Sequence, residues 1–514
     1  MPFKAFNNSF SLPETVFDFT IIGAGAAGIC LAVNLSKQGK RVMLIESGSI
    51  DLQAKYQALN KVISTGKKMN GITDGRKRAI GGTTIAWGGQ SLPFSPIDFE
   101  KREWLNNSGW PISYEDIYPY YAEANDFMGI TSNHYYGEEA LIEIKLKNPG
   151  FDENIFDYHT SKWAEEPNFK KRYQDYLERN VFVLYHATLN DIVLEKNSIK
   201  SIEVVNFEKN SLNIPVKNLI IAAGGIESNR ILLSYPQLCG LYKNHHLVGK
   251  GFMDHPCLDI GEIITKDEFR LQQYFSTHLY KKMKTSIRLS LSRNWQQKKQ
   301  VLNGSVCLFF ELDSNLNIYH KIKRLKYQWS THTLYGILRN MGKLSKSLYA
   351  YLVKSFIYKP GARAIISLMV EQESIPLSHL TLADELDNLD QKKVQVNWDI
   401  GFTTWSTIIT ISDNLKNEFE RLNFGRVNYN ENITIDNKDW KELLSDVNHH
   451  MGGCKMSDTP EAGIVDKNLK IWGIDNAFVA SAAVFPTASH SNPTLTLLAL
   501  CQRLSTYLNN VHES

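Results

Sequence analysis

The sequence predicts an α/β fold in two parts, and three stretches of the chain carry this prediction. Residues 17–46 have the pattern of a strand, a glycine-rich turn, a helix and a second strand. From 262 to 444 the pattern changes to alternating runs such as TSIRLSLSR, SVCLFFEL and KVQVNWDI, which are typical of an antiparallel sheet with amphipathic helices among its strands. Residues 445–512 return to small-residue turns and one final helix. We therefore expect a first domain formed by residues 15–261 and 445–512, with a second domain, residues 262–444, inserted into it.

The glycine-rich turn, within FDFTIIGAGAAG, places its glycines at the spacing Gly-x-Gly-x-x-Gly. Gly23 permits the tight turn, Gly25 lets a pyrophosphate approach the backbone, and Gly28 lets helix and strand pack closely. The next strand, RVMLIE, ends at Glu46, where this arrangement places an acid that binds a ribose hydroxyl. The alternative is a glycine-rich turn in an unrelated α/β domain. The order of all these elements favours a Rossmann-like site for a dinucleotide, FAD or NAD.

The rest of the chain helps to choose between these two dinucleotides. A flavoenzyme that is reduced by NAD(P)H commonly carries a second glycine motif of the same kind. The other glycine-dense segments, IGGTTIAWGG, IAAGGIESNR and MGGCKM, lack its spacing. If the single nucleotide is FAD, the electrons come from the organic substrate, which indicates an oxidase or a dehydrogenase.

Composition excludes several other classes of protein. The chain has 514 residues, 43% of them hydrophobic, and its 57 Lys and Arg against 54 Asp and Glu disfavour nucleic acid as a main partner. The six cysteines form no CxxC pair and no Cys/His cluster at zinc spacing, so we expect no metal site and a reducing compartment. No basic segment followed by an apolar one begins the chain, and no run is long and apolar enough to span a bilayer. We therefore expect a cytoplasmic protein.

Two segments near the C-terminus, HHMGGCKM and FVASAAVFPTASHSNPTLTLLAL, carry a family resemblance. With the N-terminal motif, they resemble the glucose-methanol-choline (GMC) family of FAD oxidoreductases, in which a His before a glycine is followed some forty residues later by His or Asn. His449 and Asn492 fall on these positions. The segments RAIGGTTIAWGG, DFEKREWLNNSGWPIS, LIIAAGGIESNRILLS, VGKGFMDHP and GIVDKNLKIWGIDNAFVA agree in order. The resemblance spans about residues 15–260 and 445–510, and its motifs are closest in style to the pyranose oxidase and bacterial sugar dehydrogenase branch.

The resemblance implies a glutathione-reductase-like FAD domain, an inserted α+β substrate domain, and a catalytic pair formed by His449 and Asn492. A histidine titrates close to neutral pH and suits removal of a hydroxyl proton, while an amide can donate to the developing alkoxide. His450 and His490 lie in the same motifs and compete for the role of base, but only His449 is at the family's distance from the glycine that follows. His255, in MDHP, matches a family histidine that is not usually catalytic, and we expect it to be structural.

The resemblance also implies further contacts with FAD. The loop GGTT lies beside the isoalloxazine and pyrophosphate, and Ala86 stands where some relatives bond the flavin covalently through a histidine, so we expect non-covalent FAD. The helix that begins at PTLT has free N–H groups that favour negative charge on the reduced flavin. For LYHAT and AAGGIES, ordinary buried strand ends are the alternative, and Ser481 replaces the family's Asp or Gly. Beyond the first turn, the expected cofactor-binding residues are Gly81, Gly82, Thr83, Thr84, Ala187, Ala223, Gly224, Ser481, Pro493 and Thr494.

The predicted activity is hydride transfer from a CH–OH group to flavin N5. A His/Asn pair resembles the pyranose-oxidising branch and the bacterial sugar and polyol dehydrogenases, which favours a sugar, glycoside or polyol as substrate. Alternatives are a non-sugar alcohol oxidised by the same chemistry, a lyase that keeps FAD without net redox, and a flavin-bearing component of an electron-transfer assembly. The electron acceptor stays open among oxygen, a quinone and a redox protein.

One stretch, residues 314–370, holds ten Lys or Arg and no Asp or Glu. Apolar residues from Leu334 to Phe356 fall within it at helical spacing, with basic residues between them. One interpretation is a solvated basic face of a helix that packs on the substrate domain. The other is a surface that contacts anionic lipid, an acidic partner or a negatively charged substrate, which would place the protein at a membrane surface.

Overall fold

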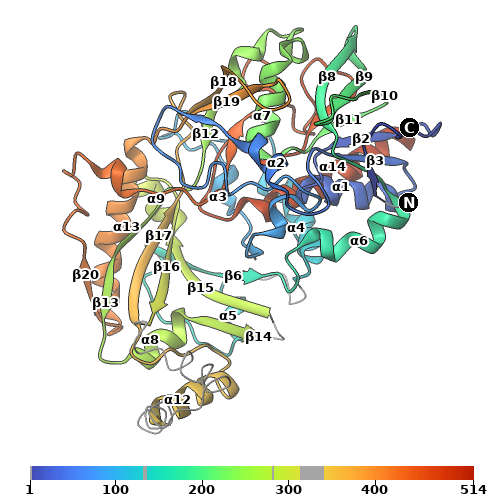
Figure 1. The fold of residues 1–514 in the computed structure, drawn as a ribbon. Coiled ribbons are helices and arrows are strands. Elements are labelled where there is room, and N and C mark those ends of the chain that lie inside the picture. The colour runs from blue at the N-terminus through green and yellow to red at the C-terminus, as the bar shows by residue number, and fades with distance from the viewer. Residues whose placement is uncertain (1–2, 131–135, 281–282, 313–340, 514) are drawn as a thin grey trace.

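A computed structural model describes residues 3–130, 136–280, 283–312 and 341–513. Two large sheets organise it. In Figure 1 one of them lies beside both ends of the chain, and the other lies at the opposite end of the molecule, next to helix α12 (Met341–Leu352). The predicted α/β fold, with an antiparallel sheet in addition to a Rossmann-like unit, is confirmed.

The sheet beside the termini is six-stranded and parallel throughout. Its strands, in order across the sheet, are β1 (Lys4–Ala5), β7 (Phe182–Tyr185), β3 (Val42–Glu46), β2 (Phe19–Ile22), β11 (Leu219–Ile221) and β22 (Ala477–Val479). Strands β2, β3, β11 and β22 are buried at every position, as expected for a parallel sheet that is covered on both faces.

The predicted strand, turn, helix and strand near the N-terminus are β2, helix α1 (Ala26–Lys37) and β3. Gly23 has φ of +102°, a backbone conformation that favours glycine. A Cβ at Gly28 would lie 1.9 Å from the carbonyl oxygen of Gly23, so only glycine allows α1 to approach the turn this closely. Local backbone geometry therefore requires glycine at both positions.

The second large sheet has eight strands and is antiparallel. Strand β14 (Thr277–Tyr280) pairs with β15, and the other strands, in order, are β20 (Arg426–Tyr429), β13 (Cys257–Ile264), β17 (Arg363–Val370), β16 (Gly304–Glu311), β15 (Met283–Leu291), β6 (Phe156–Trp163) and β5 (Gln90–Ser91). Helix α13 (Phe402–Arg421) packs against this sheet through a buried stripe that includes Trp405, Ile408 and Ile411. The predicted strands TSIRLSLSR and SVCLFFEL correspond to β15 and β16.

Two smaller sheets complete the described strands. One is three-stranded, with β10 (Ser211–Pro215), β9 (Ser198–Val205) and β8 (Thr188–Glu195), and the other contains β21 (Met451–Gly453), β12 (Lys250–Met253), β18 (His379–Leu386), β19 (Lys392–Asn397) and β4 (Ile63–Ser64). The predicted strand KVQVNWDI is β19, which therefore joins strands from outside 262–444, and β5 and β6 join the eight-stranded sheet in the same way. The domain boundaries at 261/262 and 444/445 stay predictions.

The helices cover the sheets, and α14 begins at Pro493 as predicted. Helix α4 begins after Ser113, whose side chain and that of Asp116 form a capping box. The remaining α-helices are α2 (Ala54–Gln57), α3 (Pro96–Phe99), α4 (Tyr114–Met128), α5 (Glu139–Glu143), α6 (Phe169–Asn180), α7 (Gly224–Ser234), α8 (Glu268–Phe275), α9 (Arg293–Lys299) and α14 (Pro493–Glu513).

Residues 314–340 of the basic stretch lie outside the described residues, and with them Leu334, Ile337 and Leu338 of its apolar series. In the described part, α12 ends at Leu352, so Phe356 lies beyond the helix and is buried with Tyr358. Leu348 and Leu352 of α12 are more than half exposed. The proposed contact with a lipid or acidic surface stays a prediction.

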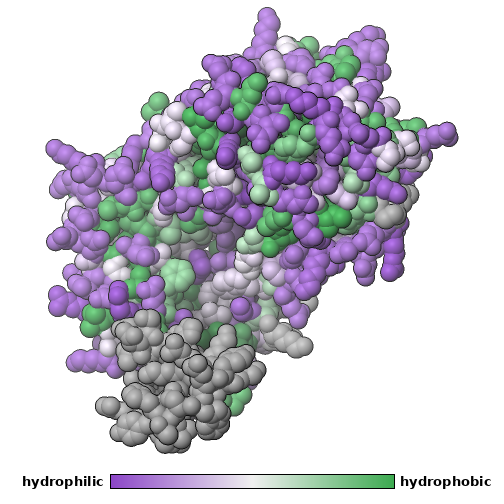
Figure 2. All heavy atoms as spheres, viewed as in Figure 1, coloured by the Kyte–Doolittle hydropathy of each residue, from purple (hydrophilic) through white to green (hydrophobic). Residues whose placement is uncertain are grey.

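The described surface is mostly hydrophilic on the face shown. On the face shown in Figure 2, hydrophilic side chains cover most of the described surface and hydrophobic ones form small groups. Among the helices that the structure describes, none has the length and apolar character needed to cross a bilayer.

Candidate active site

A cavity of about 1030 Å³ lies at the carboxyl ends of the parallel strands, the edge where sheets of this kind bind ligands. Strands of the eight-stranded sheet form part of its wall. Gly28 and Gly81 of the predicted set do not line the cavity. The predicted residues that do are Gly23, Gly25, Glu46, Gly82, Thr83, Thr84, Ala187, Ala223, Gly224, Ser481, Pro493, Thr494, His449 and Asn492.

The starts of helices α1, α7 and α14 border this cavity. No side chain caps the first turn of α1, and a Cβ at Gly25 would meet nothing within 4 Å. At the start of α7, likewise, no side chain caps the helix, and a Cβ at Gly224 would meet nothing within 4 Å. Uncapped N–H groups at helix starts bind phosphate oxygens. The residues at these helix starts therefore fit the pyrophosphate of FAD.

Glu46 lies at the end of β3 and is buried. Its two carboxylate oxygens accept the backbone N–H groups of Ala24, at 2.9 Å, and Gly48, at 2.8 Å. Burial raises the pKa of this carboxyl group, while the two N–H bonds act in the opposite direction. Glu46 thus holds the glycine turn, and each oxygen keeps a lone pair that could accept a ribose hydroxyl. The ribose contact stays a prediction.

The loop GGTT approaches the glycine turn. The N–H of Gly81 donates to the carbonyl of Ala24 at 2.8 Å, and a Cβ at Gly82 would lie 2.7 Å from the Cα of Gly25. The hydroxyl of Thr84 donates to the carbonyl of Gly81 at 2.6 Å. Ala86 lies on the cavity wall, so the position at which some relatives carry a histidine presents only a methyl group.

His449, His255 and Asn492 come together on the cavity side of the fold. Nδ1 of His449 is 2.9 Å from Nδ1 of His255, and Nε2 of His449 is 3.4 Å from Nδ2 of Asn492. Nε2 of His255 is 3.1 Å from the carbonyl oxygen of Ala488. The backbone N–H of His449 donates to both carboxylate oxygens of Asp254 at 3.1 Å.

These contacts assign the protons on both rings. The carbonyl of Ala488 can only accept, so Nε2 of His255 carries the proton and Nδ1 of His255 has a lone pair. That lone pair accepts a proton from Nδ1 of His449. Nε2 of His449 is then the unprotonated nitrogen, and it faces the amide of Asn492.

Burial sets the charge state of this group. It lowers the pKa of His449 well below its usual 6.5, and the nearby His255, His450 and Arg288 lower it further. Burial likewise lowers the pKa of His255 to about 4 and raises that of Asp254 to about 7. Both imidazoles are therefore neutral at pH 7, as the assigned protons require.

The two competing histidines make other contacts. His490 does not line the cavity, and its ring packs edge-on against His159 at 5.1 Å. His450 does line it, but its Nε2 is 3.8 Å from Asp254 and its ring stacks on Phe252. No hydrogen bond to Asn492 is described for either ring. Within the described residues, no group of three or more His, Cys, Asp or Glu could hold a metal ion.

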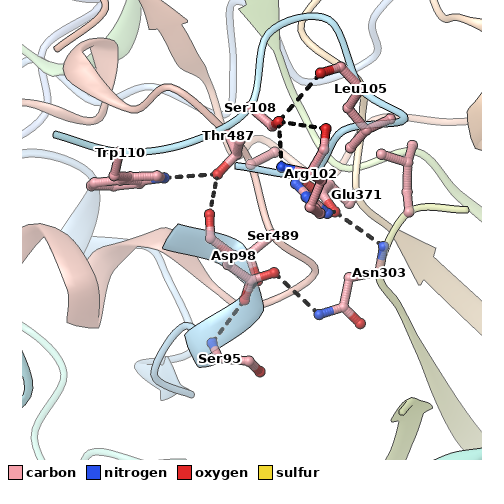
Figure 3. A network of polar contacts seen from close by, with 12 residues as sticks. Ser95, Asp98, Arg102, Leu105, Ser108, Trp110, Asn303, Glu371, Thr487 and Ser489 are labelled. Atoms are coloured by element: carbon pink, nitrogen blue, oxygen red, sulfur yellow. Dashed lines mark hydrogen bonds and ion pairs between the residues drawn. The ribbon is translucent and has the colours of Figure 1, made fainter. Parts of the chain in front are cut away.

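The loop that precedes Asn492 is fixed by a buried polar network (Figure 3). The carboxylate of Asp98 accepts the hydroxyl of Ser489 at 2.7 Å and the amide of Asn303 at 3.2 Å. The hydroxyl of Thr487 donates to the backbone carbonyl of Asp98 at 2.8 Å. Asp98 precedes α4 in the chain, and Asn303 precedes β16, so distant segments together hold this loop.

An ion pair lies beside this network. Arg102 and Glu371 are both 1% exposed and form two parallel bonds of 2.7 and 2.5 Å. Oε2 of Glu371, the acceptor of the 2.7 Å bond, also accepts the backbone N–H of Asn303, which joins the pair to the network. Paired, hydrogen-bonded charges of this kind fix geometry, and here they fix the approach of the chain to Asn492.

Two features of the site could not be predicted from the sequence. His255, expected to be structural, is hydrogen-bonded through its ring to His449. Arg288 lines the cavity from β15. The alternation in TSIRLSL separates Arg288 from Ile287 and Leu289, but the pattern of one strand does not show which face of the sheet borders a cavity.

Comparison with known proteins gives matches along the chain. The GMC oxidoreductase family model matches residues 376–501, and a model for NAD(P)-binding Rossmann-like domains matches residues 21–50. The chain is 22% identical to the fructose dehydrogenase large subunit of Gluconobacter japonicus, over 96% of this chain and 98% of that protein. It is 20% identical to 2-methyl-1,2-propanediol dehydrogenase of Mycolicibacterium austroafricanum, over 96% and 95%.

Solved structures agree in fold. A formate oxidase of Aspergillus oryzae superimposes with a TM-score of 0.57 at 15% identity, over 98% of this chain and 100% of that one. Pyridoxine 4-oxidase of Mesorbium loti superimposes with a TM-score of 0.56 at 14% identity, over 96% of this chain and 99% of that one. With the cavity, the glycine turn and the C-terminal motifs, these matches identify an FAD-dependent oxidoreductase acting on CH–OH donors, whose residues 376–501 match the GMC oxidoreductase family model.

Proposed function

We propose that the protein oxidises a CH–OH group of a sugar, glycoside or polyol to the carbonyl, with His449 as the base that removes the hydroxyl proton. One observation carries the proposal. The unprotonated Nε2 of His449 and the amide of Asn492, 3.4 Å apart, border the cavity whose other part fits FAD. The names of the two dehydrogenase relatives, one acting on fructose and one on a diol, support an alcohol of this kind.

The residues divide the work as follows. When bound, FAD supplies the acceptor for the hydride at N5. Nε2 of His449 accepts the hydroxyl proton, and Nδ2 of Asn492 donates a hydrogen bond to the substrate oxygen as its negative charge develops. His255 accepts the Nδ1 proton of His449, which keeps that ring oriented and its Nε2 free. The start of α14, at Pro493 and Thr494, favours negative charge at the adjoining wall.

The mode of cofactor attachment is part of the proposal. We propose that FAD is held without a covalent bond at the position of Ala86, because a methyl group has no atom that can bond to the flavin. The uncapped starts of α1 and α7, the GGTT loop and Glu46 then hold the nucleotide through hydrogen bonds and charge.

The pH profile of the reaction follows from the lowered pKa of His449. The neutral ring is the active form, and a lowered pKa means that this form persists as the pH falls. We expect kcat/KM to stay level down through pH 6.5 and to decline only at lower pH. Steady-state kinetics in buffers between about pH 4.5 and 8 will show the pH at which kcat/KM declines. A decline centred above pH 6.5 would contradict the assignment of a buried, neutral His449 as base.

The activity itself is tested by turnover with an artificial electron acceptor. Sugars, glycosides, polyols and simple alcohols are offered in parallel, and products are identified by mass spectrometry as alcohols that have lost two hydrogens. We expect turnover with members of the first three groups. Turnover with simple alcohols alone would refute the substrate class, and turnover with none would refute the oxidation.

A further inference from the structure

Arg288 is a buried cation on the substrate side of the cavity. It lies on β15, opposite His159 of β6, and is 8% exposed. Ile287 and Leu289, on either side of it, point to the opposite face of the sheet, where Leu289 joins the core. The side chain of Arg288 therefore projects from the centre of the eight-stranded sheet into the cavity, whose wall it forms in part.

This guanidinium has no partner in the described structure. Its Nε is buried without a hydrogen bond, and no described carboxylate lies within ion-pair distance of it. The other arginines of the cavity wall differ. Arg76, Arg78 and Arg230 all contact Glu227, at 3.1, 2.7 and 2.7 Å. The other arginines of the wall are thus paired with a carboxylate, and Arg288 is not.

The wall residues contributed by nearby strands supply no counter-ion for Arg288. Neighbouring strands contribute Cys257, Cys307, Ser367 and Met369 to the same part of the wall, and none of these side chains carries a carboxylate. An arginine keeps its charge at neutral pH, and burying it without a counter-ion is unfavourable. An anionic ligand in the cavity would supply the missing counter-charge.

We propose that the substrate is an alcohol that carries a carboxylate, such as a sugar acid or another polyhydroxy acid, and that Arg288 binds this carboxylate while the CH–OH group lies at His449. The proposal rests on the proposed function and narrows its substrate class. A single planar guanidinium matches the charge and the two oxygens of one carboxylate. A phosphate fits less well, because its second charge and third oxygen would find only the hydroxyl of Ser367 on this part of the wall.

The test compares matched substrates and variants of the FAD-loaded enzyme. D-Gluconate and D-sorbitol share a polyol chain and differ in the carboxylate, and D-glucuronate and D-glucose form a second pair. We expect the wild type to prefer the acid of at least one pair in kcat/KM. Arg288→Gln should lower the ratio of kcat/KM for the acid to kcat/KM for its neutral partner by about 100-fold. Lys284→Gln removes an exposed charge from the same strand and should leave this ratio unchanged.

A binding measurement gives a readout that does not depend on turnover. Propionate, which has no hydroxyl group to oxidise, should raise the Tm of the wild type and of Lys284→Gln, and not that of Arg288→Gln. Without ligand, Arg288→Gln should be at least as stable as the wild type, because it removes an unpaired buried charge. Arg288→Lys keeps the charge without the planar fork, and we expect it to restore part of the preference for the acid.

The outcomes separate this proposal from the one on which it rests. Equal or faster oxidation of the neutral partners, with no effect of Arg288→Gln on selectivity, would overturn the carboxylate proposal and leave the CH–OH oxidation standing. A preference for glucose 6-phosphate over both acids and neutral sugars would also overturn it. If no compound of either kind reduces the flavin, the proposed function itself fails.

Discussion

Replacing His449 by alanine is expected to slow reduction of the bound flavin by substrate about 1000-fold while FAD stays bound. A general base contributes roughly 100- to 10,000-fold to a rate, and Asn492 would remain to bind the substrate oxygen. FAD is retained because His449 contacts His255, Asp254 and Asn492 rather than the glycine turn. Anaerobic stopped-flow absorbance measures the rate, and the visible spectrum of the purified variant reports bound flavin.

The matched control is His450→Ala. His450 is also an imidazole on the cavity wall, but its ring stacks on Phe252 and is not described in contact with Asn492. We expect this variant to lose less than about tenfold in rate. An equal loss in both variants, or a rate for His449→Ala close to that of the wild type, would contradict the assignment of the base.

Two glycines of the same turn are expected to respond to alanine in opposite ways. At Gly25 the backbone has φ of −86° and a Cβ would meet nothing within 4 Å, so Gly25→Ala should leave the fold intact and intrude only on the space of the nucleotide. At Gly28 a Cβ would lie 1.9 Å from the carbonyl oxygen of Gly23, so Gly28→Ala must displace α1 from the sheet. One variant therefore affects the cofactor and the other the protein.

We expect Gly25→Ala apoprotein to keep the Tm of wild-type apoprotein and to bind FAD at least about tenfold more weakly, the loss of one charge-assisted hydrogen bond. Gly28→Ala apoprotein should lose about 1–3 kcal/mol or more of folding free energy, as overpacked cores do. Thermal unfolding and FAD titration of both apoproteins give the two quantities. Normal FAD affinity in Gly25→Ala would show that the nucleotide does not lie where the glycine turn predicts.

Features that depend on local geometry could be predicted from the sequence. The glycine turn requires residues without a Cβ, and α14 begins at its proline. Each of these is decided within a few residues of chain. The α/β fold and its Rossmann-like unit could be predicted for this reason.

Features that depend on pairing between distant segments could not be predicted from the sequence. The alternation of KVQVNWDI indicates a strand, but nothing in it selects β18 as the neighbour. His255 is recognisable as a histidine, yet its contact with His449 depends on Asp254 and Ala488 holding the two segments together. The exposure of Arg288 to the cavity depends in the same way on which face of the sheet α13 covers.

The most direct test of the account is the anaerobic visible spectrum of the wild-type protein before and after addition of sugars, polyols and their acids. We predict a flavin spectrum that bleaches on addition of at least one of these CH–OH compounds, because the proposed FAD site and the neutral His449 border the same cavity. A protein that binds flavin and is bleached by none of them would contradict the proposed oxidation, and a protein purified and reconstituted without any bound flavin would contradict the site itself.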